Sequence, residues 1–253
     1  MRHIRAVLKI LLVIIYTVTL YTIYFFFYIL FIPAGARHEP LRNFAMRSIS
    51  KGNSKILNIS YEMTGSPPRA PFFLVLNHLS YLDILPLFIF TRCTFVAKKE
   101  VENWPVLGFM VKTMGVIFID RHNRKDVIRV NRVISDTLNK YQGLVIFPEG
   151  TTSGGKTILP FKPSLLDYPA TVKLPVYAAA ISYQTTEKDL PASESVCFYG
   201  ARESFGKHFY KMAQNRAIRC SIHFGEDAVV SSDRKELSMA LHKKTESYIE
   251  KIG

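Results

Sequence analysis

The sequence has few cysteines, which argues against whole classes of protein, and few acidic residues, which leaves the chain strongly basic. Three cysteines among 253 residues are an odd number without the spacing of metal ligands. This argues against a disulfide framework and against a structural zinc site, so we expect reduced thiols. Only 20 Asp and Glu balance 33 Lys and Arg, which leaves a net charge of +13. So basic a chain either meets an anionic partner (a membrane surface, a phosphorylated substrate or nucleic acid) or simply carries a solvated basic surface.

Several motifs are also missing. The chain contains no internal repeat and no low-complexity tract. It has no G-x-S-x-G nucleophile elbow and no Cys beside a His, so a covalent enzyme intermediate is not favoured. No aromatic and basic nucleic-acid motif is visible, so we expect no nucleic-acid partner. No set of three metal ligands occurs at suitable spacing either, so we expect neither a metal nor a bound cofactor.

A long apolar run lies near the N-terminus. The stretch 10–32 contains 23 residues without a charge, more than the ~18–20 that a spanning helix needs. A signal peptide is the alternative, because Arg2, Arg5 and Lys9 precede the run and a cleavage-like Ala-Gly-Ala follows it at 34–36. The run is longer than a typical signal-peptide core of roughly 7–15 residues. We therefore expect a membrane-embedded helical segment.

The orientation of this segment is left open by the charges. Basic residues flank it on both sides, so a spanning helix and a segment that enters and leaves on one face are both possible. Residues 41–57 place apolar side chains at helical spacing among basic ones, typical of a helix in an anionic interface or of one packed on the protein. We predict a membrane segment with an amphipathic helix over 1–58 and a second domain over 59–253. The expected location is the inner, cytoplasmic membrane, with the active domain facing the cytoplasm.

Beyond the proline-rich stretch 66–71, short apolar runs alternate with helical patterns. Predicted strands are 72–76, 94–97, 116–120, 143–147, 176–182, 196–199 and 218–224. Predicted helices are 82–91, 103–114, 124–140, 163–171, 203–214 and 232–251. This alternation predicts an α/β domain with a mixed, largely parallel sheet flanked by helices.

One stretch imitates a nucleotide-binding loop. GTTSGGKT, residues 150–157, fits the pattern G-x-x-x-x-G-K-[ST]. Such a loop needs a helix directly after it, whose N-terminus binds the phosphates. Here Pro160 and Pro163 follow Lys156, and proline disfavours a helix at and just before its own position. We therefore interpret the glycines as a flexible loop after a strand.

The stretch NHLSYLD, residues 77–83, follows the first strand of the main domain. A neutral imidazole can take a proton from a hydroxyl, and a carboxylate can orient that imidazole. Within one helix, His78 and Asp83 would stand about 140° apart, so we expect His78 in the turn before a helix and Asp83 reaching back. The alternative is structural, because Ser80 and Asp83 also match a helix capping box.

A second polar stretch, FPEGT at 147–151, follows another predicted strand. Ligands of open α/β sheets bind outside the carboxyl ends of the strands. We therefore expect FPEGT and NHLSYLD to face one crevice. Taken alone, the Pro-Glu-Gly sequence is equally typical of an ordinary turn with a solvated Glu149.

Together these stretches resemble the glycerolipid acyltransferases, the family of 1-acylglycerol-3-phosphate acyltransferase. NHLSYLD matches the family's N-H-x-x-x-x-D motif, and FPEGT matches its second block. Residues 95–100 and 115–121 resemble the intervening block, and residues 174–181 the last one. The order and spacing of these blocks agree over roughly residues 60–225.

The resemblance implies transfer of a fatty acyl group from acyl-CoA or acyl-ACP to the free hydroxyl of a lysophospholipid, most directly 1-acylglycerol-3-phosphate giving phosphatidate. It implies that His78 is the general base, that Asp83 orients it, and that membrane lipids are partners. Arg121 and Lys98 would bind the anionic head group, where guanidinium and ammonium groups suit phosphate. The residues expected to bind substrate are Asn77, Ser80, Lys98, Arg121, Phe147, Pro148, Glu149, Gly150, Thr151 and Lys162.

One position departs from the family pattern. Phosphatidate-forming members often carry Arg after the Glu-Gly-Thr, where this chain has Thr152. Residues 151–166 resemble members that acylate lyso-ornithine lipid or zwitterionic lysophospholipids such as lysophosphatidylethanolamine, although Lys156 or Lys162 is placed to substitute for the missing Arg. Two further hypotheses stay open: a transacylase without a thioester donor, and a non-enzymatic, basic, membrane-anchored lipid-binding protein.

Overall fold

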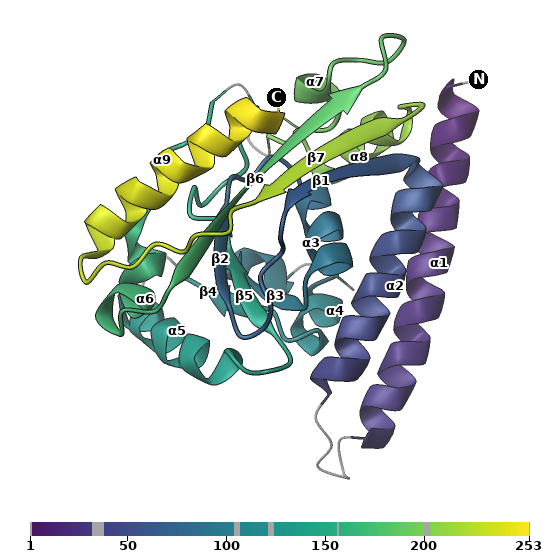
Figure 1. Ribbon diagram of the computed structural model, residues 1–253. Helices are drawn as coiled ribbons and strands as arrows, with labels where there is room; N and C mark the ends of the chain where they lie inside the picture. The colour runs from purple at the N-terminus through teal and green to yellow at the C-terminus, as the bar shows by residue number, and fades with distance from the viewer. Residues whose placement is uncertain are drawn as a thin grey trace.

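The computed structural model describes residues 2–31, 38–103, 107–120, 124–155, 157–199 and 203–252. Two long helices, α1 (Arg2–Phe31) and α2 (Glu39–Leu57), lie side by side in antiparallel directions along one flank of an α/β domain (Figure 1). The domain division at residue 58 remains a prediction.

The described strands form one seven-stranded sheet in the order β1-β7-β6-β2-β5-β3-β4. Every neighbouring pair is parallel except β6 and β7. The predicted mixed, largely parallel sheet is therefore confirmed. The strands are β1 (Ile59–Gly65), β2 (Phe73–Leu76), β3 (Cys93–Lys98), β4 (Ile117–Ile119), β5 (Gly143–Ile146), β6 (Val176–Thr185) and β7 (Ile218–Phe224).

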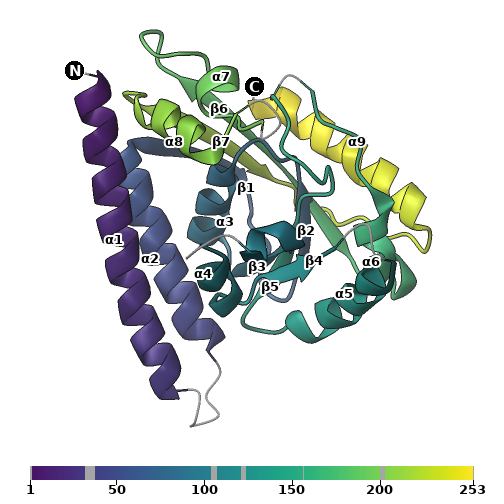
Figure 2. The ribbon, with the colours of Figure 1, turned by 180° about the vertical axis from the view of Figure 1, so that it is seen from behind.

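Helices cover both faces of the sheet (Figures 1 and 2). One face carries α3, α4 and α8 beside the α1–α2 pair, and the other carries α5, α6 and α9. The bounds of the further helices are α3 (Ile84–Phe90), α4 (Leu107–Thr113), α5 (Arg124–Thr137), α6 (Asp167–Thr171), α7 (Ala192–Ser195), α8 (Phe205–Ala213) and α9 (Arg234–Ile252). Three short 3₁₀ segments are η1 (Tyr81–Asp83), η2 (Lys99–Asn103) and η3 (Pro163–Leu166).

The central strands are buried on both sides. In β2, Leu74 and Leu76 pack into the core under α3, while Phe73 and Val75 pack into the core under α9. All four side chains are inaccessible to solvent. Because helices cover both faces of a largely parallel sheet, its strands read as continuous apolar runs. The polar residues that follow β2 and β5 therefore stand out at the rim of the sheet.

Two predictions about strands need correction. Strand β1 was not predicted, because only Ile59 of this edge strand is buried and its pairing with β7 uses backbone groups that leave no apolar pattern. The predicted strand at 196–199 is wrong: it is a turn after α7, in which the Phe198 N–H donates to the Leu79 carbonyl at 2.8 Å. Val196 and Cys197 are buried there, and a short apolar run does not distinguish a strand from a buried turn.

Helix α1 is long and apolar enough to cross a membrane, with a mean hydropathy of 2.2 over an 18-residue window. It nevertheless contacts the rest of the chain along its length. Near its start, the Lys9 ammonium donates to the carbonyl oxygens of Leu57 (2.7 Å) and Asn215 (2.8 Å). Toward its end, the Tyr24 hydroxyl donates to the Thr113 carbonyl at 3.0 Å. Fifteen residues of helix, roughly 22 Å, therefore lie against the protein.

Candidate active site

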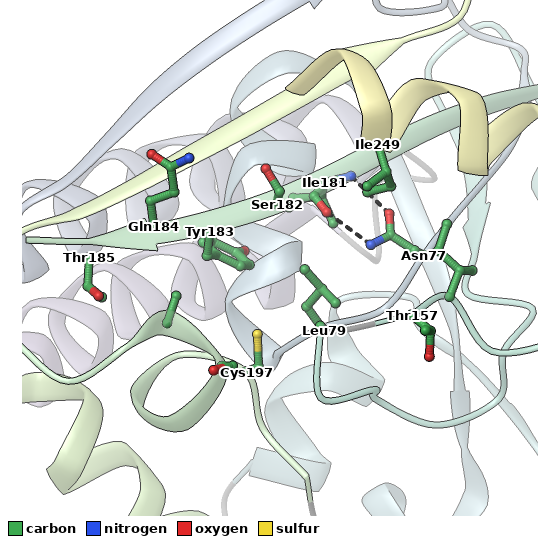
Figure 3. Close-up of a pocket in the computed structure, with 14 residues that line it drawn as sticks. Asn77, Leu79, Thr157, Ile181, Ser182, Tyr183, Gln184, Thr185, Cys197 and Ile249 are labelled. Atoms are coloured by element: carbon green, nitrogen blue, oxygen red, sulfur yellow. Dashed lines mark hydrogen bonds between the residues drawn. The ribbon is translucent and has the colours of Figure 1, made fainter. Parts of the chain in front are cut away.

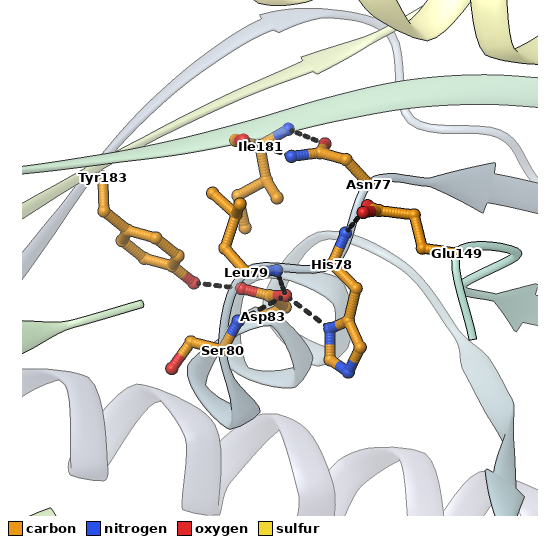
Figure 4. A network of polar contacts seen from close by, with 8 residues as sticks. All are labelled: Asn77, His78, Leu79, Ser80, Asp83, Glu149, Ile181 and Tyr183. Carbon is orange, nitrogen blue, oxygen red and sulfur yellow. Dashed lines mark hydrogen bonds and ion pairs between the residues drawn. The ribbon is translucent and has the colours of Figure 1, made fainter. Parts of the chain in front are cut away.

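Asn77 fixes the beginning of the loop after β2. Its side-chain amide donates to the Ile181 carbonyl and accepts from the Ile181 N–H, both at 2.9 Å (Figure 4). Asn77 is only 1% exposed. The pair of bonds joins the end of β2 to β6. The side chain of this predicted substrate-binding residue therefore binds the backbone of Ile181. The chain leaves the sheet in a defined direction at His78.

The next turn brings His78 and Asp83 together. The Nδ1 atom of His78 lies 2.7 Å from Oδ2 of Asp83, and Asp83 is the last residue of η1, directly before α3. This confirms the predicted placement of His78 before the helix, with Asp83 reaching back. Because a carboxylate only accepts, Nδ1 is the donor, and in the neutral ring this leaves the lone pair on Nε2. Within the described part of the chain, Nε2 forms no hydrogen bond, and the His78 side chain is 21% exposed.

Asp83 is fully buried and well supplied with donors. Its Oδ2 also accepts the backbone N–H groups of Leu79 (2.7 Å) and Ser80 (3.0 Å), and its Oδ1 accepts the Tyr183 hydroxyl at 2.9 Å (Figure 4). The bond to Ser80, which is itself fully buried, is the one that a capping box requires. The structural and catalytic interpretations of this stretch are therefore compatible, because one carboxylate serves both.

Tyr183 was not found from the sequence. It lies 100 residues from Asp83 along the chain, directly after the predicted strand 176–182, and no spacing pattern joins the two. Burial is the main cause that raises the pKa of Tyr183 well above its ordinary value, and the Asp83 charge adds to it. The phenol therefore stays protonated and donates to the carboxylate.

Glu149 joins the two polar stretches. Its Oε1 accepts the His78 backbone N–H at 2.6 Å, and its Oε2 accepts the Leu159 N–H at 2.9 Å. β2 and β5 are parallel neighbours, so their carboxyl ends meet, and the predicted shared location of NHLSYLD and FPEGT is confirmed. The alternative of a solvated Glu149 is wrong, because the residue is 1% exposed. Burial raises the pKa of Glu149 to about 7, although the two N–H donors oppose the shift.

Phe147 forms an apolar wall of the site. Its ring stacks on the His78 imidazole with centroids 4.0 Å apart and planes 20° apart. The loop that follows is held close by backbone bonds: the Ser153 N–H donates to the His78 carbonyl, and the Lys162 N–H donates to the Pro148 carbonyl, both at 2.8 Å. Gly150 adopts a φ of 77°, a left-handed conformation that favours glycine. His78 is thus held by ring stacking and by the following loop.

The other predicted residues that the structure describes have side chains that are exposed to solvent. Thr151, Lys98 and the side chain of Lys162 are exposed. Lys98 ends β3, at the same carboxyl edge as His78, because β2, β5 and β3 run parallel. Among the described residues, no hydrogen bond or ion pair connects these three side chains to the pair. The predictions for Arg121 and Lys156 fall outside the described residues.

The loop 150–157 does not lead into a helix. Residues 157–162 have no helical structure, and the next helical turn begins at Pro163. This agrees with rejecting the nucleotide-binding interpretation. The three cysteines are free, which agrees with the predicted thiols, and all three are buried.

A hollow of about 480 Å³ lies beside this loop, lined by residues that include Asn77, Tyr183 and Cys197 (Figure 3). Neither His78 nor Glu149 lines it. The imidazole therefore does not open into this hollow.

Comparisons with known proteins agree with this geometry. A family model described as Acyltransferase matches residues 59–182. The lyso-ornithine lipid O-acyltransferase of Rhodobacter capsulatus is 31% identical over 190 residues, which cover 73% of this chain and 68% of that protein. This chain belongs to the PlsC-like acyltransferases. The matched region contains His78, Asp83 and Glu149, and it ends one residue before Tyr183.

Other relatives of this chain carry a different name. The 1-acyl-sn-glycerol-3-phosphate acyltransferase of Neisseria gonorrhoeae is 36% identical over 144 residues, which is 56% of each chain. This chain therefore spans little more than half the length of that curated relative. The crystal structure of the 1-acyl-sn-glycerophosphate (LPA) acyltransferase PlsC from Thermotoga maritima superposes with a TM-score of 0.58 at 21% identity, covering 98% of this chain and 97% of that one. The superposition shows that the fold is shared.

Proposed function

We propose that this chain transfers a fatty acyl group from acyl-CoA or acyl-ACP to the free hydroxyl of a lysophospholipid, with 1-acylglycerol-3-phosphate as acceptor and phosphatidate as product. The observation that carries the proposal is the bond from His78 Nδ1 to the buried Asp83 carboxylate, which leaves Nε2 as the proton acceptor of a partly exposed side chain.

The reaction follows from that arrangement. The Nε2 atom of His78 takes the proton of the acceptor hydroxyl while its oxygen attacks the thioester carbonyl carbon. A carbon–oxygen bond forms, the carbon–sulfur bond breaks, and the departing thiolate recovers the proton from the imidazolium. Asp83 keeps the ring in the productive tautomer and stabilises its transient positive charge. A general base of this kind contributes about 10²–10⁴ in rate.

The surrounding residues support that base. Glu149 binds the His78 backbone, and Phe147 covers one face of the ring, so both the position and the solvation of the imidazole are constrained. Lys98 at the end of β3 and Lys162 at the start of η3 are proposed to meet the acceptor phosphate, together with Arg121. A long cationic side chain can reach a phosphate without a preformed contact in the free enzyme.

Lyso-ornithine lipid is the second candidate acceptor. Thr152 stands where a phosphate-directed Arg is often found, and the Rhodobacter relative with this acceptor in its name aligns over more of the chain than the Neisseria protein. An acceptor without a free phosphomonoester would need fewer cations in the loop after Glu149. The two candidates therefore differ in their requirement for charge at this loop.

Helix α1 is proposed to lie along the surface of one leaflet, in the inner membrane, with the catalytic domain on the cytoplasmic side. Its contacts at Lys9 and Tyr24 keep both ends of the helix on the protein. If α1 crossed the bilayer by itself, one of its two ends would have to leave the protein and lose its contact. The outward side chains Leu8, Leu12, Ile15, Phe26 and Leu30 are between 52% and 63% exposed, and such a face is buried favourably among acyl chains.

The test is an acyl-transfer assay on the purified full-length protein. Palmitoyl-CoA and palmitoyl-ACP are offered separately with lysophosphatidate, lysophosphatidylethanolamine and lyso-ornithine lipid, and a reaction without any thioester checks for transacylation. We expect product from lysophosphatidate with the wild type, and a loss of at least about 10² in rate in His78→Ala. His223→Ala, on β7, is the matched control and should retain activity.

The outcomes separate the candidates. Product from lyso-ornithine lipid alone would replace the proposed acceptor but keep the chemistry. Turnover without a thioester would identify a transacylase. A His78→Ala rate within a few-fold of the wild type would remove His78 as the base. Salt-sensitive lipid binding with no product from any acceptor would leave the non-enzymatic hypothesis.

A further inference from the structure

A groove rich in cations lies at the end of the sheet opposite to His78. We call it the basic groove, and its volume is about 730 Å³. Its positive side chains are Arg47 on α2, Arg69 before β2, Arg92 before β3 and Lys140 before β5. These loops meet at the amino ends of β2, β3 and β5, whereas His78 follows the carboxyl end of β2. The four residues of β2 alone separate the two places by roughly 13 Å.

The charges of the basic groove are unbalanced. None of the residues that line it is acidic, and among the described residues none of its four cations forms an ion pair. The Lys140 ammonium lies over the ring of Tyr141, 5.1 Å from the ring centroid. The ring carries no net charge, so this contact does not neutralise the ammonium. Four like charges around one hollow repel one another, and an anion bound between them would relieve that repulsion. Arginine, which supplies three of the four, suits phosphate because its guanidinium can donate two parallel bonds.

Apolar side chains accompany the cations. Phe44 lines the groove one helical turn before Arg47 and is 73% exposed, and Phe90 lines it from the end of α3. The opposite side of this part of α2 packs on the second half of α1, through Met46 and Tyr24. The groove thus adjoins the α1–α2 pair, of which α1 is proposed to lie on the membrane. A phosphate that carries acyl chains satisfies both features, whereas a small soluble anion would leave Phe44 in water.

We propose that the basic groove binds the phosphate-bearing headgroup of an anionic bilayer phospholipid, at a site separate from the His78–Asp83 pair. The bound lipid is not consumed. It holds this end of the sheet against an anionic membrane, while the acceptor and the donor meet at the other end. This site is independent of which lysolipid is acylated, because none of its residues belongs to the candidate active site.

The test measures binding of the full-length protein to vesicles by cosedimentation at physiological salt. One set of vesicles is phosphatidylcholine alone, and the other also contains phosphatidylglycerol. The groove variant is Arg69→Glu with Arg92→Glu. The matched control is Lys235→Glu with Lys243→Glu, which makes the same change of charge at exposed positions on α9, on the far side of the sheet (Figure 2).

We expect the wild type to prefer the anionic vesicles by at least about tenfold, the groove variant to lose that preference, and the control to keep it within about threefold. Binding to phosphatidylcholine should be equal in all three. Equal losses in the groove variant and the control would show that diffuse surface charge is responsible, and would overturn the proposal. A second outcome would also overturn the proposal. If the wild type shows no preference for anionic vesicles, and inorganic phosphate or coenzyme A raises its Tm but not that of the groove variant, the ligand of the groove is a soluble anion.

Folding is checked separately by circular dichroism. If the double charge reversal disturbs the fold, Arg69→Gln with Arg92→Gln replaces it, since neutral side chains at these exposed positions add no repulsion. A neutral variant that keeps the full preference for anionic vesicles would refute the site. Acyl transfer in detergent should persist in the groove variants, which distinguishes a failure of the groove from a failure of the proposed reaction.

Discussion

Replacing Glu149 with glutamine tests how a buried carboxylate between two loops couples folding to pH. Burial raises the pKa of Glu149 from 4.5 to about 7. Between these values, the native protein holds a proton that the unfolded chain has released. The free energy of unfolding must therefore fall as pH rises through this window. A carboxylate whose pKa is lowered in the native state behaves in the opposite way.

The size of the effect follows from the two pKa values. Linkage gives a loss of about 2.5 kcal/mol between pH 5 and pH 8 for this group alone. For a chain of this length, that corresponds to a decrease in Tm of roughly 5–10 °C. A glutamine side chain does not titrate, so the Glu149→Gln variant should lack this component of the pH dependence. It should also lose about 1–3 kcal/mol at every pH, because a single amide oxygen cannot accept from both His78 and Leu159 as the carboxylate does.

The assay is thermal unfolding in detergent from pH 4 to pH 9, for the wild type, Glu149→Gln and Glu62→Gln. Glu62 lies on the edge strand β1 with an exposed side chain, so its variant should follow the wild-type curve. The informative quantity is the difference between the wild-type and Glu149→Gln curves as a function of pH, since other titrating groups contribute equally to both. Parallel curves would show that Glu149 does not hold the extra proton, and would refute the reasoning.

Two further predictions concern contacts that the structure brings together. Tyr183→Phe removes one of the hydrogen bonds to the buried Asp83, so we expect the free energy of unfolding to fall by about 1.5–3 kcal/mol and kcat to fall by about tenfold, with little change in KM. Chemical denaturation and steady-state kinetics would measure these two effects. An unchanged free energy of unfolding together with an unchanged kcat would contradict the prediction. Lys9→Met breaks two bonds to backbone carbonyls, so hydrogen exchange, followed by mass spectrometry, should become faster in the first turns of α1 but not in the exposed control Lys51→Met. Equal exchange in the two variants would show that Lys9 does not hold the helix.

The local parts of the site could be predicted from the sequence. Five residues separate His78 from Asp83, so helical geometry alone requires the histidine to precede the helix. The apolar runs before His78 and after Lys140 indicate strands, and carboxyl ends of parallel strands meet at one edge. In the same way, proline after Lys156 was sufficient to reject a nucleotide-binding loop. These inferences use only spacing, periodicity and the backbone preferences of single residues.

Other features depend on partners that are distant in the chain. From its own neighbours, Glu149 was equally typical of a solvated turn and of a site residue, and its burial became visible only with its bonds to the His78 and Leu159 backbone N–H groups. Strand β1 is held at the edge of the sheet by β7, more than 150 residues later, and its own side chains do not indicate a strand.

By itself, the sequence determined the alternating α/β architecture, the apolar N-terminal helix and the pairing of His78 with Asp83, because each depends on the order of residues within a few turns of chain. Only the tertiary structure decided that Tyr183 completes the hydrogen bonds of Asp83, that α1 lies along the protein through Lys9 and Tyr24, and that scattered cations converge in one groove. Such contacts join segments that are distant in the chain, as far apart as Lys9 and Asn215, which are separated by 206 residues. Long-range packing of this kind leaves no periodic signal in the chain, and it becomes visible only when the sheet order is known.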